Sequence, residues 1–177
     1  MRLRLRRATL NDAPILEQWD TDPAVIAATS DDDDTERAFG GLDWRAEITS
    51  DSDVSFHVIA ELDGRPIGAM QICDPHLEAT HYWGVIEPNL RAIDIWIGAD
   101  SDRNKGYGTE MMRLAHKLCF AAKDVTAIVI DPLSSNTRAI AFYQRLGYTP
   151  VERRMFDDDD CLVLKLTREA WLTSSPR

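Results

Sequence analysis

The sequence predicts a mixed α/β fold of the α+β type, with six to seven strands and about four helices. Three observations indicate this class. Two apolar runs at 54–62 and 65–73 flank an Asp-Gly pair, which is typical of a β-hairpin. Two strongly helical segments follow the hairpin instead of alternating with its strands. A length of 177 residues favours a single domain, 1–177, in which 168–177 is a C-terminal tail.

The chain before the hairpin gives a weaker pattern. Residues 2–7 alternate Leu and Arg, which indicates an edge strand, and Asn11 or Asp12 is placed to cap a following helix. The stretch 21–53 is acidic and poorly periodic, although 39–48 offers a second short helix. We expect this stretch to be solvated and mobile over part of the site, and the sequence leaves open whether it closes as a lid.

The centre of the chain combines a long loop with a buried strand. Residues 74–90 contain the aromatic pair Tyr82 and Trp83, and long loops in compact domains are often functional. In the following strand, 90–98, the three isoleucines share one face, so Ala92, Asp94 and Trp96 share the other. This parity places the Asp94 carboxylate in the middle of an otherwise buried strand.

The last third of the chain has the clearest periodicity. An amphipathic helix is predicted from about Tyr107 to Ala122, and the apolar run 125–130 indicates a short buried strand. A second helix follows, with Asn136 as its N-cap and Gly147 just beyond its end. Two final strands are expected near 149–156 and 161–166, on either side of an acidic turn.

Composition narrows the class of partner. The formal net charge of -10 argues against a nucleic-acid-binding protein and suits a cationic or amine-bearing partner. The three cysteines form no paired motif, which indicates reduced thiols in a cytoplasmic protein. No apolar run approaches the roughly 20 residues that a membrane helix needs, so we expect no membrane association.

The segment "SDRNKGYGTEMM", residues 101–112, has the character of an anion-binding loop. Backbone N–H groups at 104–109 would be left unpaired at the start of the helix, and Gly106 and Gly108 let that backbone approach an anion closely. The glycines could instead serve only a tight turn and close helix packing. The Walker string is missing, and a dinucleotide fingerprint survives only weakly, with Asp131 as its acidic residue.

The loop and its surroundings resemble the GNAT superfamily of N-acetyltransferases. The string Arg103-Asn104-Lys105-Gly106-Tyr107-Gly108 matches the superfamily's Q/R-x-x-G-x-G/A signature, and "NTRAIAFYQRLGY" resembles its N-x-x-A-x-x-x-Y-x-x-x-G-F/Y segment. The resemblance covers roughly 1–167. It implies the GNAT fold, in which helices flank a central mixed, mostly antiparallel sheet.

The resemblance also implies acetyl-CoA as co-substrate. The pyrophosphate is then expected on the amides of the glycine loop, and the pantetheine arm on the backbone of the strand before it. Asn136 resembles the residue that contacts the pantetheine, and it can serve as the N-cap at the same time. The residues expected to hold the coenzyme are therefore Trp96, Ile97, Arg103, Asn104, Lys105, Gly106, Tyr107, Gly108, Thr109, Asn136 and Ala139.

A narrower resemblance concerns the acceptor. The strand "AID" at 92–94 and the segment "IDPLSSNTRAIAFY" resemble the subgroup that contains aminoglycoside 6′-N-acetyltransferases. Aromatic residues precede the strand in that subgroup as well, so Tyr82, Trp83 and Asp94 are expected to bind the substrate. A small cationic amine of the aminoglycoside type is thus the expected acceptor, and the chain is expected to be a monomer or homodimer.

The implied chemistry is direct attack of an amine on the thioester. The amine arrives protonated, so a base or a water relay must remove a proton. Asp94 is the candidate base, and its alternative is a structural or substrate-orienting carboxylate. Tyr143 matches the tyrosine that protonates the departing thiolate in this superfamily, and its alternative is a packed aromatic ring.

Other functions remain open at this stage. The acceptor could be a protein N-terminus or a lysine side chain, or the domain could be a non-catalytic module that binds acetyl-CoA or an antibiotic. Cys73, Asp74, His76 and His81 fit no zinc spacing, so no metal is expected.

Overall fold

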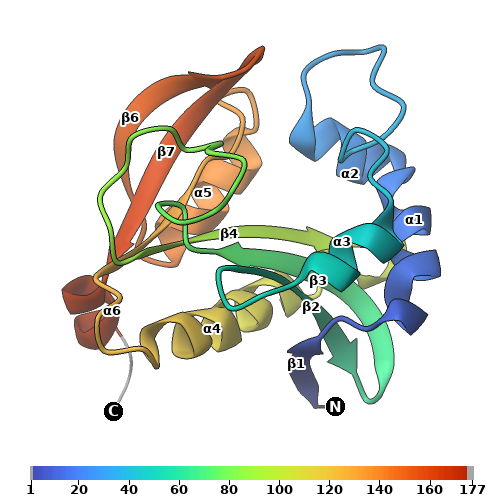
Figure 1. The fold of residues 1–177 in the computed structure, drawn as a ribbon, viewed down its shortest axis with the longest axis horizontal. Helices are drawn as coiled ribbons and strands as arrows, with labels where there is room; N and C mark the ends of the chain where they lie inside the picture. Colours follow the sequence, from blue (N-terminus) through green and yellow to red (C-terminus); the bar gives the residue numbers. More distant parts are fainter. Residues whose placement is uncertain (1, 175–177) are drawn as a thin grey trace.

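The computed structural model describes residues 2–174 and contains one seven-stranded sheet (Figure 1). Its strand order is β1-β2-β3-β4-β5-β7-β6, and β4 and β5 form the parallel pair while the other neighbours run antiparallel. The mixed, mostly antiparallel sheet is therefore confirmed. The strands are β1 (Leu3–Arg7), β2 (Ser55–Leu62), β3 (Arg65–Cys73), β4 (Leu90–Ile97), β5 (Ala127–Ile130), β6 (Thr149–Phe156) and β7 (Asp159–Thr167).

The described residues form six α-helices, two more than the sequence predicts. The elements beyond the expected four are α2 and α6, and two short 3-10 turns at 10–12 and 100–102 complete the set. The helices are α1 (Ala13–Asp20), α2 (Pro23–Thr29), α3 (Trp44–Ser50), α4 (Tyr107–Phe120), α5 (Thr137–Arg145) and α6 (Arg168–Ser174).

Helix α2 corrects the expectation of an irregular stretch at 21–53. The Asp22 carboxylate accepts hydrogen bonds from the amides of Ala24 and Val25, and Pro23 occupies the first turn, where its missing N–H costs nothing. Val25 of α2 and Trp44 of α3 are almost completely buried. The N-cap Asp22 and the burial of Val25, rather than a periodic apolar pattern, stabilise this short helix.

Helix α6 corrects the expectation of a C-terminal tail. The Arg168 guanidinium donates to the carbonyl oxygens of Phe120, Ala122 and Val125, which lie at and just beyond the end of α4. Trp171 stacks on Phe120 with ring centroids 4.8 Å apart. The segment thus provides partners for carbonyl groups that the end of α4 leaves without a helical partner.

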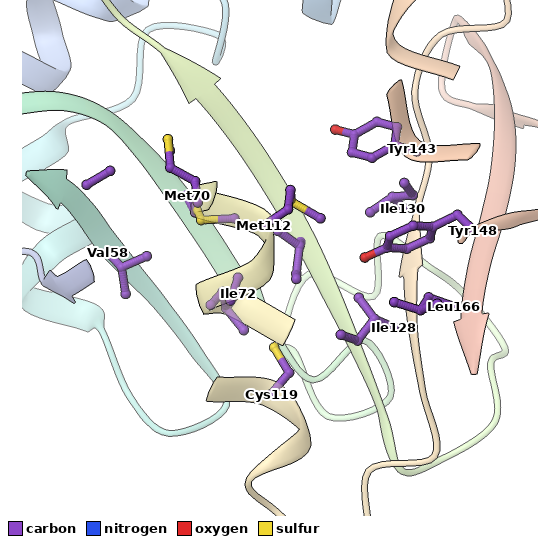
Figure 2. Packing of buried hydrophobic residues seen from close by; sticks show 14 of the residues in the cluster. Val58, Met70, Ile72, Met112, Cys119, Ile128, Ile130, Tyr143, Tyr148 and Leu166 are labelled. Carbon is purple, nitrogen blue, oxygen red and sulfur yellow. The ribbon is translucent and has the colours of Figure 1, made fainter. Parts of the chain in front are cut away.

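The strand parity predicted for β4 is confirmed. Ile93, Ile95 and Ile97 pack with the main core, which α4 forms with one face of the sheet (Figure 2). Trp96 packs on the opposite face with α1, α2 and α3. Ala92 joins a third cluster under the loop 74–89. Asp94 therefore lies between two apolar clusters.

β4 and β5 separate after a short parallel start. Their pairing covers Leu90–Ala127, Arg91–Ile128 and Ala92–Val129, whereas β4 remains paired with β3 up to Ile97. The backbone of β4 from residue 93 onward consequently has no strand partner on its β5 side. Exposed backbone groups of this kind can add a further extended segment.

Gly98, at the end of β4, fixes the position of α1. A Cβ atom built on Gly98 would lie 1.8 Å from Nε1 and 2.0 Å from Cε2 of Trp19, whose ring is almost fully buried. The indole of Trp19 therefore occupies the space that a side chain at 98 would need.

We predict that Gly98→Ala lowers the free energy of unfolding by about 1–3 kcal/mol, because the buried Trp19 ring has to move. Urea denaturation measures this loss. Gly108→Ala is the matched control, since its Cβ would make ordinary contacts of 3.5 Å to Phe142 and 3.6 Å to Ile97. Equal stability of Gly98→Ala and the unmodified protein would contradict the packing described.

Candidate active site

A cavity of about 810 Å³ lies between α2, the end of β4, the glycine loop and α5. Most residues expected to hold the coenzyme line it. β4 and the loop contribute Trp96, Ile97, Arg103, Asn104, Gly106, Gly108 and Thr109. α5 and its N-cap contribute Asn136, Ala139 and Tyr143. The structure thus brings together segments that are about 40 residues apart in the chain.

The glycine loop presents backbone amides at the N-terminus of the 14-residue helix α4. Asn104 and Gly106 have φ values of +61° and +83°, and no side chain caps the helix at Gly106. Left-handed residues such as these turn successive N–H groups of the backbone toward one point, as in anion-binding nests. Gly106 is required by its backbone conformation, whereas a Cβ at Gly108 would make only ordinary contacts with Phe142 and Ile97.

Three loop residues are not placed as expected for residues that contact the coenzyme. Lys105 is exposed and Tyr107 packs against the main core, and neither is among the residues that line the cavity. Arg103 lines the cavity, yet its guanidinium donates to Asp22 and to the carbonyl oxygens of Ile97 and Gly98.

The N-terminal turn of α5 supplies a cation that sequence reasoning missed. Asn136 is the N-cap, as predicted, and its Oδ1 accepts from the amide of Ala139 at 3.0 Å. Arg138 lines the cavity and donates to the side chain of Asn104, so it connects α5 to the glycine loop. Arg145, at the other end of α5, also lines the cavity. In the sequence, the signal available for Arg138 and Arg145 was that both follow the N-cap Asn136 within the predicted helix.

Asp94 and Asp131 form an acidic pair next to the cavity. Solvent reaches Asp94, but the surrounding protein desolvates it and the Asp131 carboxylate repels it, so the pKa of Asp94 is raised to about 7. Burial likewise raises the pKa of Asp131. The sequence indicated Asp131 only as the acidic residue of a dinucleotide site, although Asp131 directly follows the apolar run 125–130.

Tyr143 extends from α5 toward β4 and is 9% exposed (Figure 2). Burial raises the pKa of its hydroxyl group, and the charges of Asp94 and Asp131 raise it further. The phenol therefore remains protonated at neutral pH, close to the acidic pair.

The two aromatic residues of the loop 74–89 have different surroundings. Tyr82 is 46% exposed, stacks on Phe156 and donates its hydroxyl hydrogen to Asp131 at 2.7 Å. Trp83 is 4% exposed and belongs to the apolar cluster with Phe156. Tyr82 thus contacts Asp131, whereas Trp83 supports the loop from within. Neither is among the residues that line the cavity.

Two further polar residues of that loop, His76 and Asp74, have structural partners. Nδ1 of His76 lies 2.9 Å from the carbonyl oxygen of Ile86, and Asp74 pairs with Arg91 at 3.0 Å. Within residues 2–174, no group of three or more His, Cys, Asp or Glu side chains is arranged to hold a metal ion. No helix in that range is long and apolar enough to cross a membrane.

The fold and the glycine loop define an acetyltransferase domain. A family model described as an acetyltransferase (GNAT) domain matches residues 8–156. The chain belongs to this family.

Relatives within the family include aminoglycoside acetyltransferases. Aminoglycoside N(6′)-acetyltransferase type 1 of Klebsiella pneumoniae is 32% identical over 114 residues, which are 64% of this chain and 57% of that protein. The chain thus matches little more than half the length of that relative. The kanamycin resistance protein of Rhizobium radiobacter is 32% identical over 96 residues, 54% of this chain and 89% of its own.

Solved structures show the same architecture over nearly the whole chain. Aminoglycoside acetyltransferase AAC(6′)-Ib in complex with ribostamycin and coenzyme A superimposes with a TM-score of 0.84 at 25% identity, covering 98% of both chains. A spermidine N-acetyltransferase chimera from Vibrio cholerae superimposes with a TM-score of 0.73 at 14% identity, covering 97% of this chain and 99% of its own.

We predict that Asp131→Asn lowers the pKa of Asp94 below about 7, because the repelling charge is removed while the amide still accepts from Tyr82. NMR titration of the side-chain carboxyl carbons measures the shift. Asp124→Asn removes an equal charge elsewhere and is expected to leave Asp94 unchanged. An unaltered Asp94 titration in Asp131→Asn would refute the coupling.

Proposed function

We propose that the protein is an acetyl-CoA-dependent N-acetyltransferase that acetylates a primary amine of a small cationic acceptor of the aminoglycoside type. One observation carries the proposal. A single cavity has a cluster of helix N-terminal amides in its wall, and another residue of that wall, Tyr143, lies in the field of the acidic pair Asp94 and Asp131. These two sites suit an anionic donor and a cationic acceptor.

The donor side fits the coenzyme in shape and charge. The amides from Asn104 to Thr109 are suited to bind a pyrophosphate, and Arg138 adds a positive charge beside them. The unpartnered edge of β4 at Ile95–Ile97 offers backbone groups to the amides of an extended pantetheine arm. The thioester would then reach the part of β4 that carries Asp94.

The acceptor side has the negative charge expected of a site that binds a polyamine. Asp94, Asp131 and the exposed Tyr82 surround one region, and the chain carries a net charge of -10. Carboxylates in a partly desolvated site attract ammonium groups more strongly than carboxylates in bulk water. The aminoglycoside relatives named above support this class of acceptor.

Asp94 is suited to accept the proton that the attacking amine must lose. A base with a pKa near 7 is partly ionised at neutral pH and still basic enough to take a proton. The nitrogen of the neutral amine attacks the thioester carbonyl carbon, the C–S bond breaks, and the acetyl group remains on nitrogen. Tyr143 donates its proton to the departing thiolate, and the second proton, which the nitrogen loses as the amide forms, returns to the Tyr143 oxygen.

We predict that Asp94→Asn lowers kcat by about 10²–10⁴-fold, the usual contribution of a general base. Steady-state release of coenzyme A thiol, with kanamycin as acceptor, measures the loss, and calorimetric titration with coenzyme A is expected to show unchanged binding. In the unmodified protein, protonation of Asp94 should reduce kcat/KM below about pH 7. Normal kcat in Asp94→Asn would exclude Asp94 as the base.

We predict that Tyr143→Phe lowers kcat on the order of 10²-fold and leaves the melting temperature nearly unchanged, because the ring and its packing are retained. Thiol release and thermal unfolding measure the two quantities. Tyr148→Phe is the control, since its hydroxyl lies 3.0 Å from His116 inside the core. A loss of stability without a loss of kcat would assign Tyr143 to packing alone.

A further inference from the structure

Arg103 has a set of contacts that coenzyme binding does not explain. Its Nη2 donates to Oδ1 of Asp22 at 2.7 Å and to the carbonyl oxygen of Gly98 at 2.6 Å, and its Nε donates to the carbonyl oxygen of Ile97 at 3.2 Å. The side chain is only 17% exposed. The guanidinium is therefore committed to protein acceptors, and Asp22 compensates its charge.

Asp22 is the N-cap of α2, whose residues Ala24 and Val25 line the cavity. Its carboxylate caps α2 through the amides of Ala24 and Val25 while it receives Arg103. It also follows the end of α1, where its own amide donates to the carbonyl oxygen of Trp19 at 3.1 Å. Since Trp19 packs on Gly98, the corner between α1 and α2 rests directly on the end of β4.

The other end of α2 is attached across the cavity. The Asp31 carboxylate, just after α2, accepts from the Ser135 hydroxyl at 2.6 Å. Ser135 directly precedes the N-cap of α5. Between these two anchors, residues of α2 including Ala24, Ala27 and Ala28 line the cavity.

We propose that Arg103 is a positioning residue that links the coenzyme loop to α2, so that binding of the coenzyme orders the wall of the cavity that α2 forms. The link is the Arg103–Asp22 ion pair. Coenzyme binding on the amides of 104–109 fixes the start of that loop, and the ion pair transmits the constraint to the N-terminus of α2. The proposal rests on the proposed function, because it presumes a donor on the loop and an acceptor beside α2.

Because both side chains are partly buried, the attraction within this ion pair is stronger than within a pair on the surface. The side chains of Arg103 and Asp22 are 17% and 26% exposed, so solvent screens them less than fully exposed partners. The same carboxylate oxygen holds the arginine and both capping amides. Loss of the arginine would therefore leave the cap of α2 in place but detach the capping carboxylate from the coenzyme loop.

The coupling has a measurable thermodynamic form. If the coenzyme orders α2, it raises the affinity for the acceptor, and the acceptor raises the affinity for the coenzyme by the same factor, typically about 5- to 150-fold. The ratio of the acceptor dissociation constants without and with coenzyme A reports this factor.

The test uses Asp22→Asn, because asparagine caps a helix as well as aspartate does but cannot form the ion pair. We expect the KM for kanamycin to rise by about 10-fold, within the usual range of such coupling, while the dissociation constant of coenzyme A in the absence of acceptor changes by less than about 2-fold. Calorimetry should show the coupling ratio falling toward 1. Asp53→Asn is the control, since it removes a carboxylate from the exposed Arg7–Asp53 pair.

Hydrogen exchange gives a readout that does not depend on turnover. Coenzyme A should protect the amides of 26–30 in the unmodified protein and in Asp53→Asn, but not in Asp22→Asn. Equal protection in all three proteins, or a higher KM for acetyl-CoA alone, would overturn the link. Failure of coenzyme A to bind the unmodified protein would overturn the proposed function together with the link, whereas binding without any change in α2 would overturn the link alone.

Discussion

The structure depends on the separation of β4 from β5 after Ala92 and Val129. Up to this point the two strands share a ladder, and beyond it that edge of β4 has no strand partner, although the carbonyl oxygen of Ile97 accepts from Nε of Arg103. The separation also makes room for α5, which places Asn136 and Tyr143 in the wall of the cavity. One interruption of hydrogen bonding thus creates the binding edge, the cavity and the approach of α5 to β4.

The same strand connects two regions of opposite electrostatic character. Along β4, Asp94 comes first, the free edge at Ile95–Ile97 follows, and the amides of the glycine loop lie beyond its end. The acidic pair is unfavourable in isolation, because each carboxylate raises the free energy of ionising the other. Desolvation of Asp94, together with that repulsion, raises the pKa of Asp94 toward neutral pH and makes a cationic ligand stabilising.

Much of this arrangement could be predicted from the sequence. The parity of β4, the cap at Asn136 and the glycine loop depend on local rules, and each is present in the structure. Features set by long-range contacts were not accessible. The Arg103–Asp22 pair joins residues 81 positions apart, the Tyr82–Asp131 hydrogen bond spans 49, and the burial of Trp83 depends on Phe156. Short helices such as α2 are stabilised by caps and burial, which periodicity does not detect.

The most direct test of the central claim is a crystal structure of the protein with coenzyme A. The account predicts the pyrophosphate within hydrogen-bonding distance of the amides between Asn104 and Thr109, and the pantetheine arm beside the free edge of β4 at Ile95–Ile97. The sulfur atom would then lie between Asp94 and Tyr143. Coenzyme A bound away from this edge, or a β4 edge covered by protein in the complex, would contradict it.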